Sequence, residues 1–144
     1  MNNAVVYFSK TGSTKKVGEA MAKAIGSESY EIGDYPKDRQ ADLIFIGGAI
    51  YGGQIDPALV SFIEGLDPKK IGRAAVFTTC ASVHAQTAAK AEALIKSALE
   101  MRGIPVAAKT FSCKGRFLFL NGKCPDETSL HNAGTFASAL TAGV

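Results

Sequence analysis

The sequence predicts an α/β fold: a doubly wound, five-stranded parallel sheet in the order 2-1-3-4-5, with helices on both faces. Two observations predict it. Short apolar runs, typical of strands buried on both faces, alternate along the chain with stretches of helical periodicity. The 144 residues contain no long linker, repeat or biased tract, so we expect one domain spanning 1–144. Right-handed crossovers leave few other strand orders open to such an alternation.

Each element follows from its own local pattern. Five runs of β-forming residues are expected to be strands, the second of them weakly marked: 4–8, 30–32, 43–46, 74–77 and 105–108, the last extending toward 111. Four stretches with apolar residues at helical spacing are expected to be helices: 14–25, 57–65, 86–102 and 129–140. Ala24 and Leu94 are among the helical residues expected to face the core, and Gly47 and Gly48 are expected to end the third strand. No helix is marked between the second and third strands.

Composition and charge exclude several classes of protein. Apolar residues make up 47% and charged residues 20% of the chain, as in an ordinary globular domain. No apolar stretch approaches the roughly 20 residues of a membrane helix, and the N-terminus does not resemble a signal peptide. We therefore expect no membrane span and a cytoplasmic location. The net charge of +3 comes without a basic block, which favours a solvated surface over a nucleic-acid partner.

The cysteines do not form a recognisable motif. Cys80, Cys113 and Cys124 are widely spaced, and no Cys-x-x-Cys pair is present. This spacing predicts free thiols in a reducing compartment and indicates no metal site.

A polar run between the first predicted strand and the first predicted helix has the composition of an anion-binding loop. Hydroxyls and the N–H groups of a helix start can surround a phosphate, and the helix dipole favours its negative charge. Gly12 permits a positive φ and a close approach of the backbone. Thr14 could instead serve only as a helix N-cap beside a polar turn. The run is Ser9, Lys10, Thr11, Gly12, Ser13 and Thr14.

This run resembles the phosphate loop of the flavodoxin family, whose pattern is Ser/Thr-x-Thr-Gly-x-Thr. Ser9, Thr11, Gly12 and Thr14 match the pattern, and Ser13 fills its variable place. The resemblance implies a flavodoxin-like fold, as in short-chain flavodoxins, and an FMN whose phosphate this loop holds. Other anion loops are not indicated, because the P-loop, the Gly-x-Gly-x-x-Gly turn and the Cys/Arg phosphatase loop are all missing from this position.

The resemblance implies two further loops, which would contact the isoalloxazine ring. In the second loop Tyr51 would stack on the ring and Gly52 would present its backbone to flavin N5. In the third loop the backbone from Thr79 to Ser82 would contact the pyrimidine edge. His84 could aid proton transfer or simply be a surface residue, and Cys80 could be a redox thiol or a buried bystander. The predicted ring contacts are Ala49, Ile50, Tyr51, Gly52, Gly53, Thr79, Cys80, Ala81, Ser82 and His84.

The chain also departs from the family. The third loop lacks the usual aromatic and acidic residues, the chain is basic overall, and Gly53 stands where flavodoxins often have an acid. We therefore expect a less negative hydroquinone potential and partners unlike those of typical flavodoxins.

The function that these residues favour is FMN-based electron transfer between redox partner proteins, with no catalytic residue assigned. A carrier is favoured over a dedicated enzyme. Two alternatives stay open: a flavin-dependent oxidoreductase of the NAD(P)H:quinone or protoporphyrinogen type, and a flavin-free interaction module on the same fold.

Overall fold

The computed structural model describes residues 2–10, 12–51, 54–80, 85–114 and 124–142, and for 51 and 85–88 it describes the backbone alone. Helices and strands alternate along these residues as predicted. The strands are β1 (Asn3–Phe8), β2 (Glu28–Glu31), β3 (Ala41–Tyr51), β4 (Gln54–Ile55), β5 (Ile71–Cys80) and β6 (Phe111–Lys114). The helices are α1 (Ser13–Ile25), α2 (Pro57–Glu64), the short 3-10 helix η1 (Pro68–Lys70), α3 (Ala85–Met101) and α4 (Glu127–Ala142).

The sheet has the predicted order. Its strands follow the path β2-β1-β3-β5-β6 with parallel pairing throughout, and β4 is a short antiparallel addition to β3. With β4 set aside, this is the order 2-1-3-4-5, so the predicted fold class is confirmed. No helix lies between β2 and β3, as expected.

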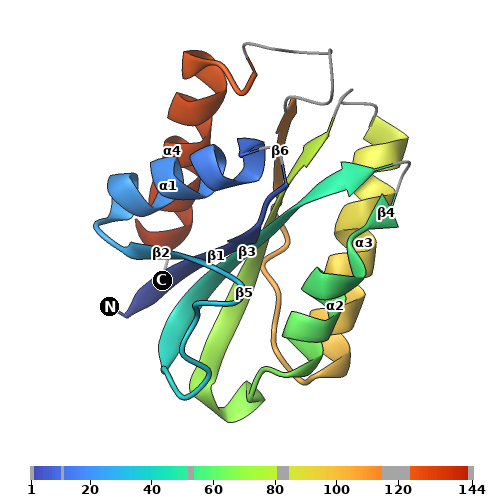
Figure 1. Cartoon of the computed structure of the whole chain (residues 1–144). Coiled ribbons are helices and arrows are strands. Elements are labelled where there is room, and N and C mark those ends of the chain that lie inside the picture. The colour runs from blue at the N-terminus through green and yellow to red at the C-terminus, as the bar shows by residue number, and fades with distance from the viewer. Residues whose placement is uncertain (1, 11, 52–53, 81–84, 115–123, 143–144) are drawn as a thin grey trace.

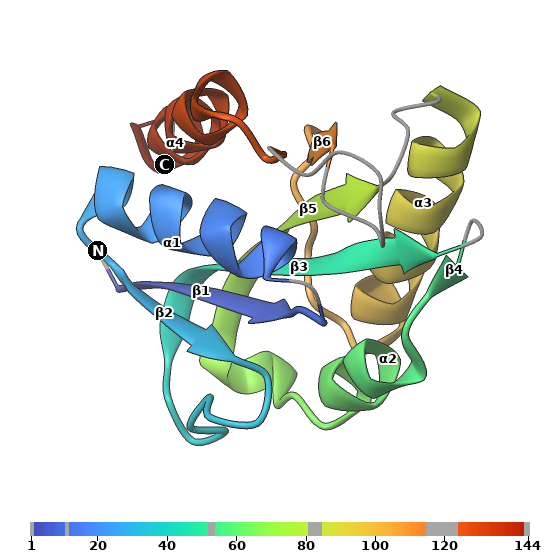
Figure 2. The same ribbon diagram turned by 45° about the horizontal axis from the view of Figure 1, so that its top comes forward.

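Helices cover both faces of the sheet, as Figures 1 and 2 show. The face covered by α1 and α4, here called the α1/α4 face, buries Phe45 and Phe77 with Met21 of α1. The opposite α2/α3 face buries Ile46 and Val76 against the two other long helices. Successive residues of a strand point to opposite faces, so each central strand supplies both cores. These strands are therefore apolar without alternation, which is why they were recognisable in the sequence.

The third strand does not end at Gly47 and Gly48, contrary to expectation. β3 continues through both glycines to Tyr51. A Cβ on Gly47 would lie 2.2 Å from the ring of Phe77, and a Cβ on Gly48 would lie 2.7 Å from Cδ2 of Leu59. The glycines therefore make room for a large neighbour on each face of the sheet, instead of marking a turn.

Other predictions are wrong at element edges. The second strand is Glu28–Glu31, earlier than predicted, and the last strand is Phe111–Lys114, with a single bridge from Val106 to Ala74 in place of a strand at 105–108. Both segments are edge strands of the sheet, and neither is a continuous apolar run, so the pattern of a fully buried strand did not mark them.

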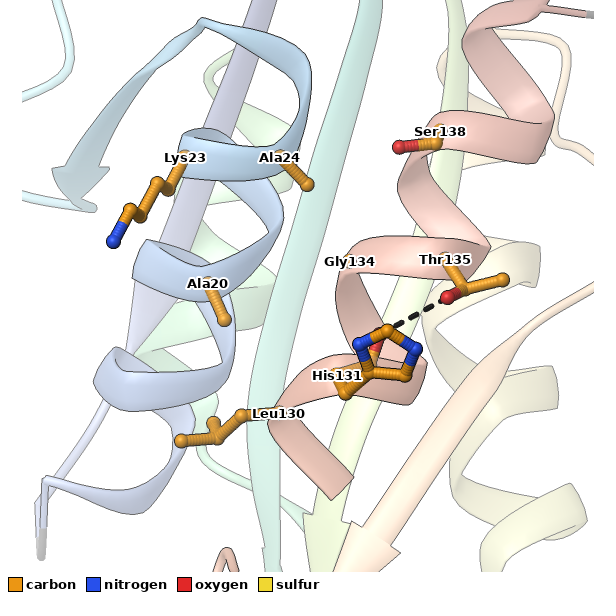
Figure 3. Close-up of a pocket in the computed structure, with 8 residues that line it drawn as sticks. All are labelled: Ala20, Lys23, Ala24, Leu130, His131, Gly134, Thr135 and Ser138. Atoms are coloured by element: carbon orange, nitrogen blue, oxygen red, sulfur yellow. Dashed lines mark hydrogen bonds between the residues drawn. The ribbon is translucent and has the colours of Figure 1, made fainter. Parts of the chain in front are cut away.

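Two residues predicted for the core are exposed. Leu94 is 49% exposed because the buried strip of α3 runs along Ala91, Ile95 and Leu99, one position away from it. Ala24 is exposed on the line of contact between α1 and α4 (Figure 3). Within the parts of the chain that the structure describes, no helix combines the length and apolar character needed to cross a bilayer.

Candidate functional site

The predicted binding segments converge at one edge of the sheet. Ser9 and Lys10 directly follow β1, and the other two segments lie at the ends of β3 and β5. The register places Phe8 opposite Gly48 and Ile50 opposite Cys80, so the carboxyl ends of these three neighbouring strands lie side by side. This edge, at the switch point of the strand order, is where doubly wound sheets bind ligands. The predicted contacts Thr11, Gly52, Gly53, Ala81, Ser82 and His84 lie outside the described residues.

Gly12 gives the first loop its shape. It has a φ of +89° and occupies the N-cap position of α1, so the predicted positive φ is confirmed. Its N–H donates to Ser9 Oγ at 3.0 Å, and its carbonyl accepts from the Lys16 N–H at 3.1 Å. A Cβ on Gly12 would meet no described residue within 4 Å, and the positive φ is the observation that favours glycine here. The loop thus turns directly into the helix at Gly12.

Thr14 is not the N-cap, which corrects that alternative. It is the second residue of α1, and the described residues supply no side-chain cap to this helix. The Thr14 hydroxyl lies 2.8 Å from the hydroxyl of Thr79, at the end of β5. The two side chains are 1% and 0% exposed. This bond joins the first and third predicted segments across 65 residues of sequence, and no local pattern indicated it.

An ion pair joins the first loop to α2. Lys10 Nζ lies 3.1 Å from Asp56 Oδ2, with the two side chains 58% and 19% exposed. Asp56 is the N-cap of α2 and accepts the Ala58 N–H at 2.8 Å. The Ala58 N–H, and after it Lys10, hold the pKa of Asp56 below its usual value of 3.8. Sequence reasoning missed Asp56, although an aspartate directly before a proline is a common helix start.

The second predicted segment is a strand where a loop was expected. Ala49 and Ile50 are buried residues of β3, and Ile50 pairs with Ile55 of β4. The backbone of Tyr51 pairs with Gln54. The hairpin between β3 and β4 continues the strand beyond the glycines. β3 therefore ends at Tyr51, three residues beyond Gly48.

The third predicted segment also begins within a strand. Thr79 and Cys80 belong to β5, because pairing with β6 extends this strand to its end opposite Lys114. Cys80 is buried and packs with Ile50 and with Ala91 of α3. Burial also raises the pKa of the neighbouring Cys113 thiol to about 12.

A hollow of about 670 Å³ lies between α1 and α4, away from these strand ends (Figure 3). Side chains of both helices line it, among them Lys23 of α1 and Leu130 of α4, and the Thr135 hydroxyl there donates to the carbonyl of His131 within α4. None of its lining residues is a predicted flavin contact. It therefore adds nothing to the site at the sheet edge.

Comparisons with known proteins agree with this geometry. A family model described as a flavodoxin domain matches residues 4–118. No curated protein sequence matches the chain.

Solved structures share the architecture over the whole chain. A flavodoxin from the domain Archaea has 18% identity and a TM-score of 0.79, with 99% of this chain and 98% of that chain covered. Flavodoxin 2 from Bacillus cereus has 16% identity and a TM-score of 0.74, with both chains fully covered at 100%. An NADH:FMN oxidoreductase in its apo form has 14% identity and a TM-score of 0.71, with 100% of this chain and 90% of that chain covered. At these identities the likeness establishes the fold alone.

Proposed function

This chain belongs to the flavodoxin-domain family, and from that premise we propose that it binds FMN and carries electrons between redox partner proteins. Family membership supports a flavin-binding redox protein in general. The observation that carries the more specific proposal is the shape of the first loop. A left-handed Gly12 opens α1 shortly after β1, between Ser9 and Thr14, two of the hydroxyl residues in the family's phosphate pattern.

The described donors fit a phosphate. Ser9 Oγ accepts the Gly12 N–H, so its own proton remains available for a phosphate oxygen. The first N–H groups of a helix have no partners within the helix, and the dipole makes this end of α1 attractive to an anion. The Lys10 ammonium is paired with Asp56, so hydroxyls and N–H groups do most of the binding in this proposal. The proposed phosphate contacts are Ser9, Lys10, Thr11, Gly12, Ser13 and Thr14.

The ends of β3 and β5 would hold the ring. We assign the stacking contact to Tyr51, the contact with flavin N5 to the backbone of Gly52, and the pyrimidine edge to the backbone from Thr79 to Ser82. His84 is the candidate for a proton near the ring. The bound flavin supplies the electron chemistry, and the protein supplies position and electrostatics.

The charges near the proposed site favour a less negative reduction potential for the hydroquinone. The chain has a net charge of +3, and among the described charges at this edge Lys10 is paired with Asp56 while Lys114 ends β6. Negative charge near a flavin disfavours its anionic hydroquinone. A site without excess acidic residues therefore destabilises the hydroquinone less. A redox titration is expected to give a potential for the semiquinone/hydroquinone couple that is less negative than that of an acidic flavodoxin.

The decisive experiment is a visible absorption spectrum of the purified protein, repeated after FMN is added and the sample is desalted. Retained flavin bands are the expected result. A protein that stays colourless after both steps would contradict the proposal and favour the interaction module. A flavin-loaded protein that oxidises NAD(P)H steadily with a quinone would instead favour the oxidoreductase alternative.

A further inference from the structure

The bond between Thr14 and Thr79 is a buried polar contact between the start of α1 and the end of β5. The two hydroxyl oxygens lie 2.8 Å apart, and both side chains are almost fully excluded from solvent. Thr79 points to the α1/α4 face, where Phe77 of the same strand also lies. Burying a hydroxyl is costly unless it is hydrogen-bonded. The bond between the two threonines offsets the cost of burying both hydroxyls.

The direction of this bond matters for a phosphate at the first loop. A threonine hydroxyl has one proton and two lone pairs, whereas the oxygens of a phosphate dianion only accept. If Thr14 donates to Thr79, its proton is used and its lone pairs face the phosphate. If Thr79 donates to Thr14, the proton of Thr14 is available to the phosphate. Only in the second arrangement can the Thr14 hydroxyl donate a hydrogen bond to the phosphate.

We propose that Thr79 is a positioning residue for cofactor selection: it donates to Thr14 and thereby turns the Thr14 proton toward the phosphate of the bound flavin. This inference rests on the proposed FMN function. Thr79 does not touch the phosphate in this arrangement, and it acts through Thr14. The effect of its side-chain hydroxyl on flavin binding is therefore confined to flavins that carry a phosphate, and the Thr79 backbone is unchanged in the variants.

The strand offers a matched control one residue away. Thr78 is also fully buried, but it points to the α2/α3 face, and its hydroxyl has no hydrogen-bond partner among the described residues. Thr78→Val and Thr79→Val make the same chemical change in the same strand. They differ in whether a partner hydroxyl is lost.

The test compares FMN with riboflavin, which lacks the phosphate, in titrations of the apoprotein followed by quenching of flavin fluorescence. We expect Thr79→Val to weaken FMN binding about tenfold, as for the loss of one hydrogen bond to a charged group, and to change riboflavin binding less than about twofold. Thr79→Ser should restore FMN binding, and Thr78→Val should leave both affinities unchanged. The double variant Thr14→Val/Thr79→Val should bind FMN no more weakly than Thr14→Val alone, since Thr79 acts through Thr14.

Several outcomes would overturn the inference. Equal losses for FMN and riboflavin would mean that Thr79 has a structural role only, and additive losses in the double variant would mean that it acts independently of Thr14. If Thr79→Val does not fold, Thr79→Cys keeps a similar volume with a weaker donor, and unchanged FMN binding there would also overturn the inference. A wild-type protein that binds neither flavin defeats the proposed function as well. If the wild type binds FMN and the Thr79→Val variant binds it with the same affinity, this inference is overturned while the proposed function stands.

Discussion

At the carboxyl end of β5, the two faces of the sheet differ in what their buried hydroxyl groups contact. On the α1/α4 face, buried Thr79 is bonded to Thr14 at the start of α1. On the α2/α3 face, the adjacent Thr78 is equally buried, and its hydroxyl has no partner among the described residues. A buried pair of hydroxyls therefore connects the α1/α4 face to the proposed phosphate loop, whereas the buried hydroxyl on the α2/α3 face makes no such contact with a described residue. A buried polar group is informative only together with what it contacts.

The largest expected effect comes from the paired glycines of β3, one for each face. Gly47→Ala would place a Cβ 2.2 Å from the Phe77 ring, with three ring atoms within 2.4 Å. Because the ring is fully buried and cannot move aside, we expect a loss of about 3 kcal/mol in the free energy of unfolding. Urea denaturation measures this loss.

Gly48→Ala is the matched change on the α2/α3 face. Its Cβ would lie 2.7 Å from one methyl carbon of Leu59, and the next nearest atom is 3.9 Å away. A small rotation of that side chain relieves the contact, so a loss of less than about 1 kcal/mol is expected. Equal losses for the two variants would show that the faces do not differ in packing at this point.

These glycines also show where sequence reasoning reaches its limit for the fold. The strand order followed from local patterns, because strands buried on both faces are apolar without interruption. The end of β3 did not follow. A glycine pair has the same local pattern whether it ends a strand or makes room for Phe77 and Leu59, and these neighbours come from other parts of the chain.

The next effect in size tests the two threonines through stability, independently of any ligand. Thr79→Val leaves the buried Thr14 hydroxyl without its partner, and we expect a loss of about 1–3 kcal/mol in the free energy of unfolding. Thr78→Val removes a buried hydroxyl that has no described partner, so the expected change is neutral or slightly stabilising. Thermal denaturation followed by circular dichroism compares them. The double variant Thr14→Val/Thr79→Val should recover part of the loss, and simple additivity would speak against a direct bond between the hydroxyls.

The candidate site could be predicted in part for the same physical reason. Gly12 was predictable because a positive φ at a strand-to-helix turn is a local requirement. The contacts of Thr14 with Thr79 and of Lys10 with Asp56 were not predictable, since they join segments that approach one another only after the sheet has formed. The sequence thus predicted the members of the first loop better than their partners.

A smaller effect than that of Thr79→Val is expected at Asp56, where the loop before α1 contacts the start of α2. Asp56 caps α2 through the Ala58 N–H and pairs with Lys10. Asp56→Ala loses both contacts, and a cost of about 1 kcal/mol is expected, as for other N-cap aspartates. Asp56→Asn keeps an acceptor for the Ala58 N–H and loses only the charge, so we expect it to lower the free energy of unfolding by only a few tenths of a kcal/mol. Asp67→Ala is the control, since Asp67 caps the short η1 before Pro68 in the same way, and it should cost less than Asp56→Ala.

The pH dependence separates the charge of Asp56 from its cap. The pKa of Asp56 is held below its usual 3.8 in the folded protein, mainly by the Ala58 N–H and then by Lys10. A lowered folded pKa means that the carboxylate's contribution is fully present above the unfolded pKa and is lost as the pH falls through the folded value. The stability difference between wild type and Asp56→Asn should therefore stay constant near neutral pH and shrink below about pH 4. Lys10→Met should reduce that difference at neutral pH, and added salt should reduce it as well, because an exposed pair is screened. A difference that grew on acidification would mean that the folded protein favours the protonated acid, and the ion pair would then have no part in joining the two faces.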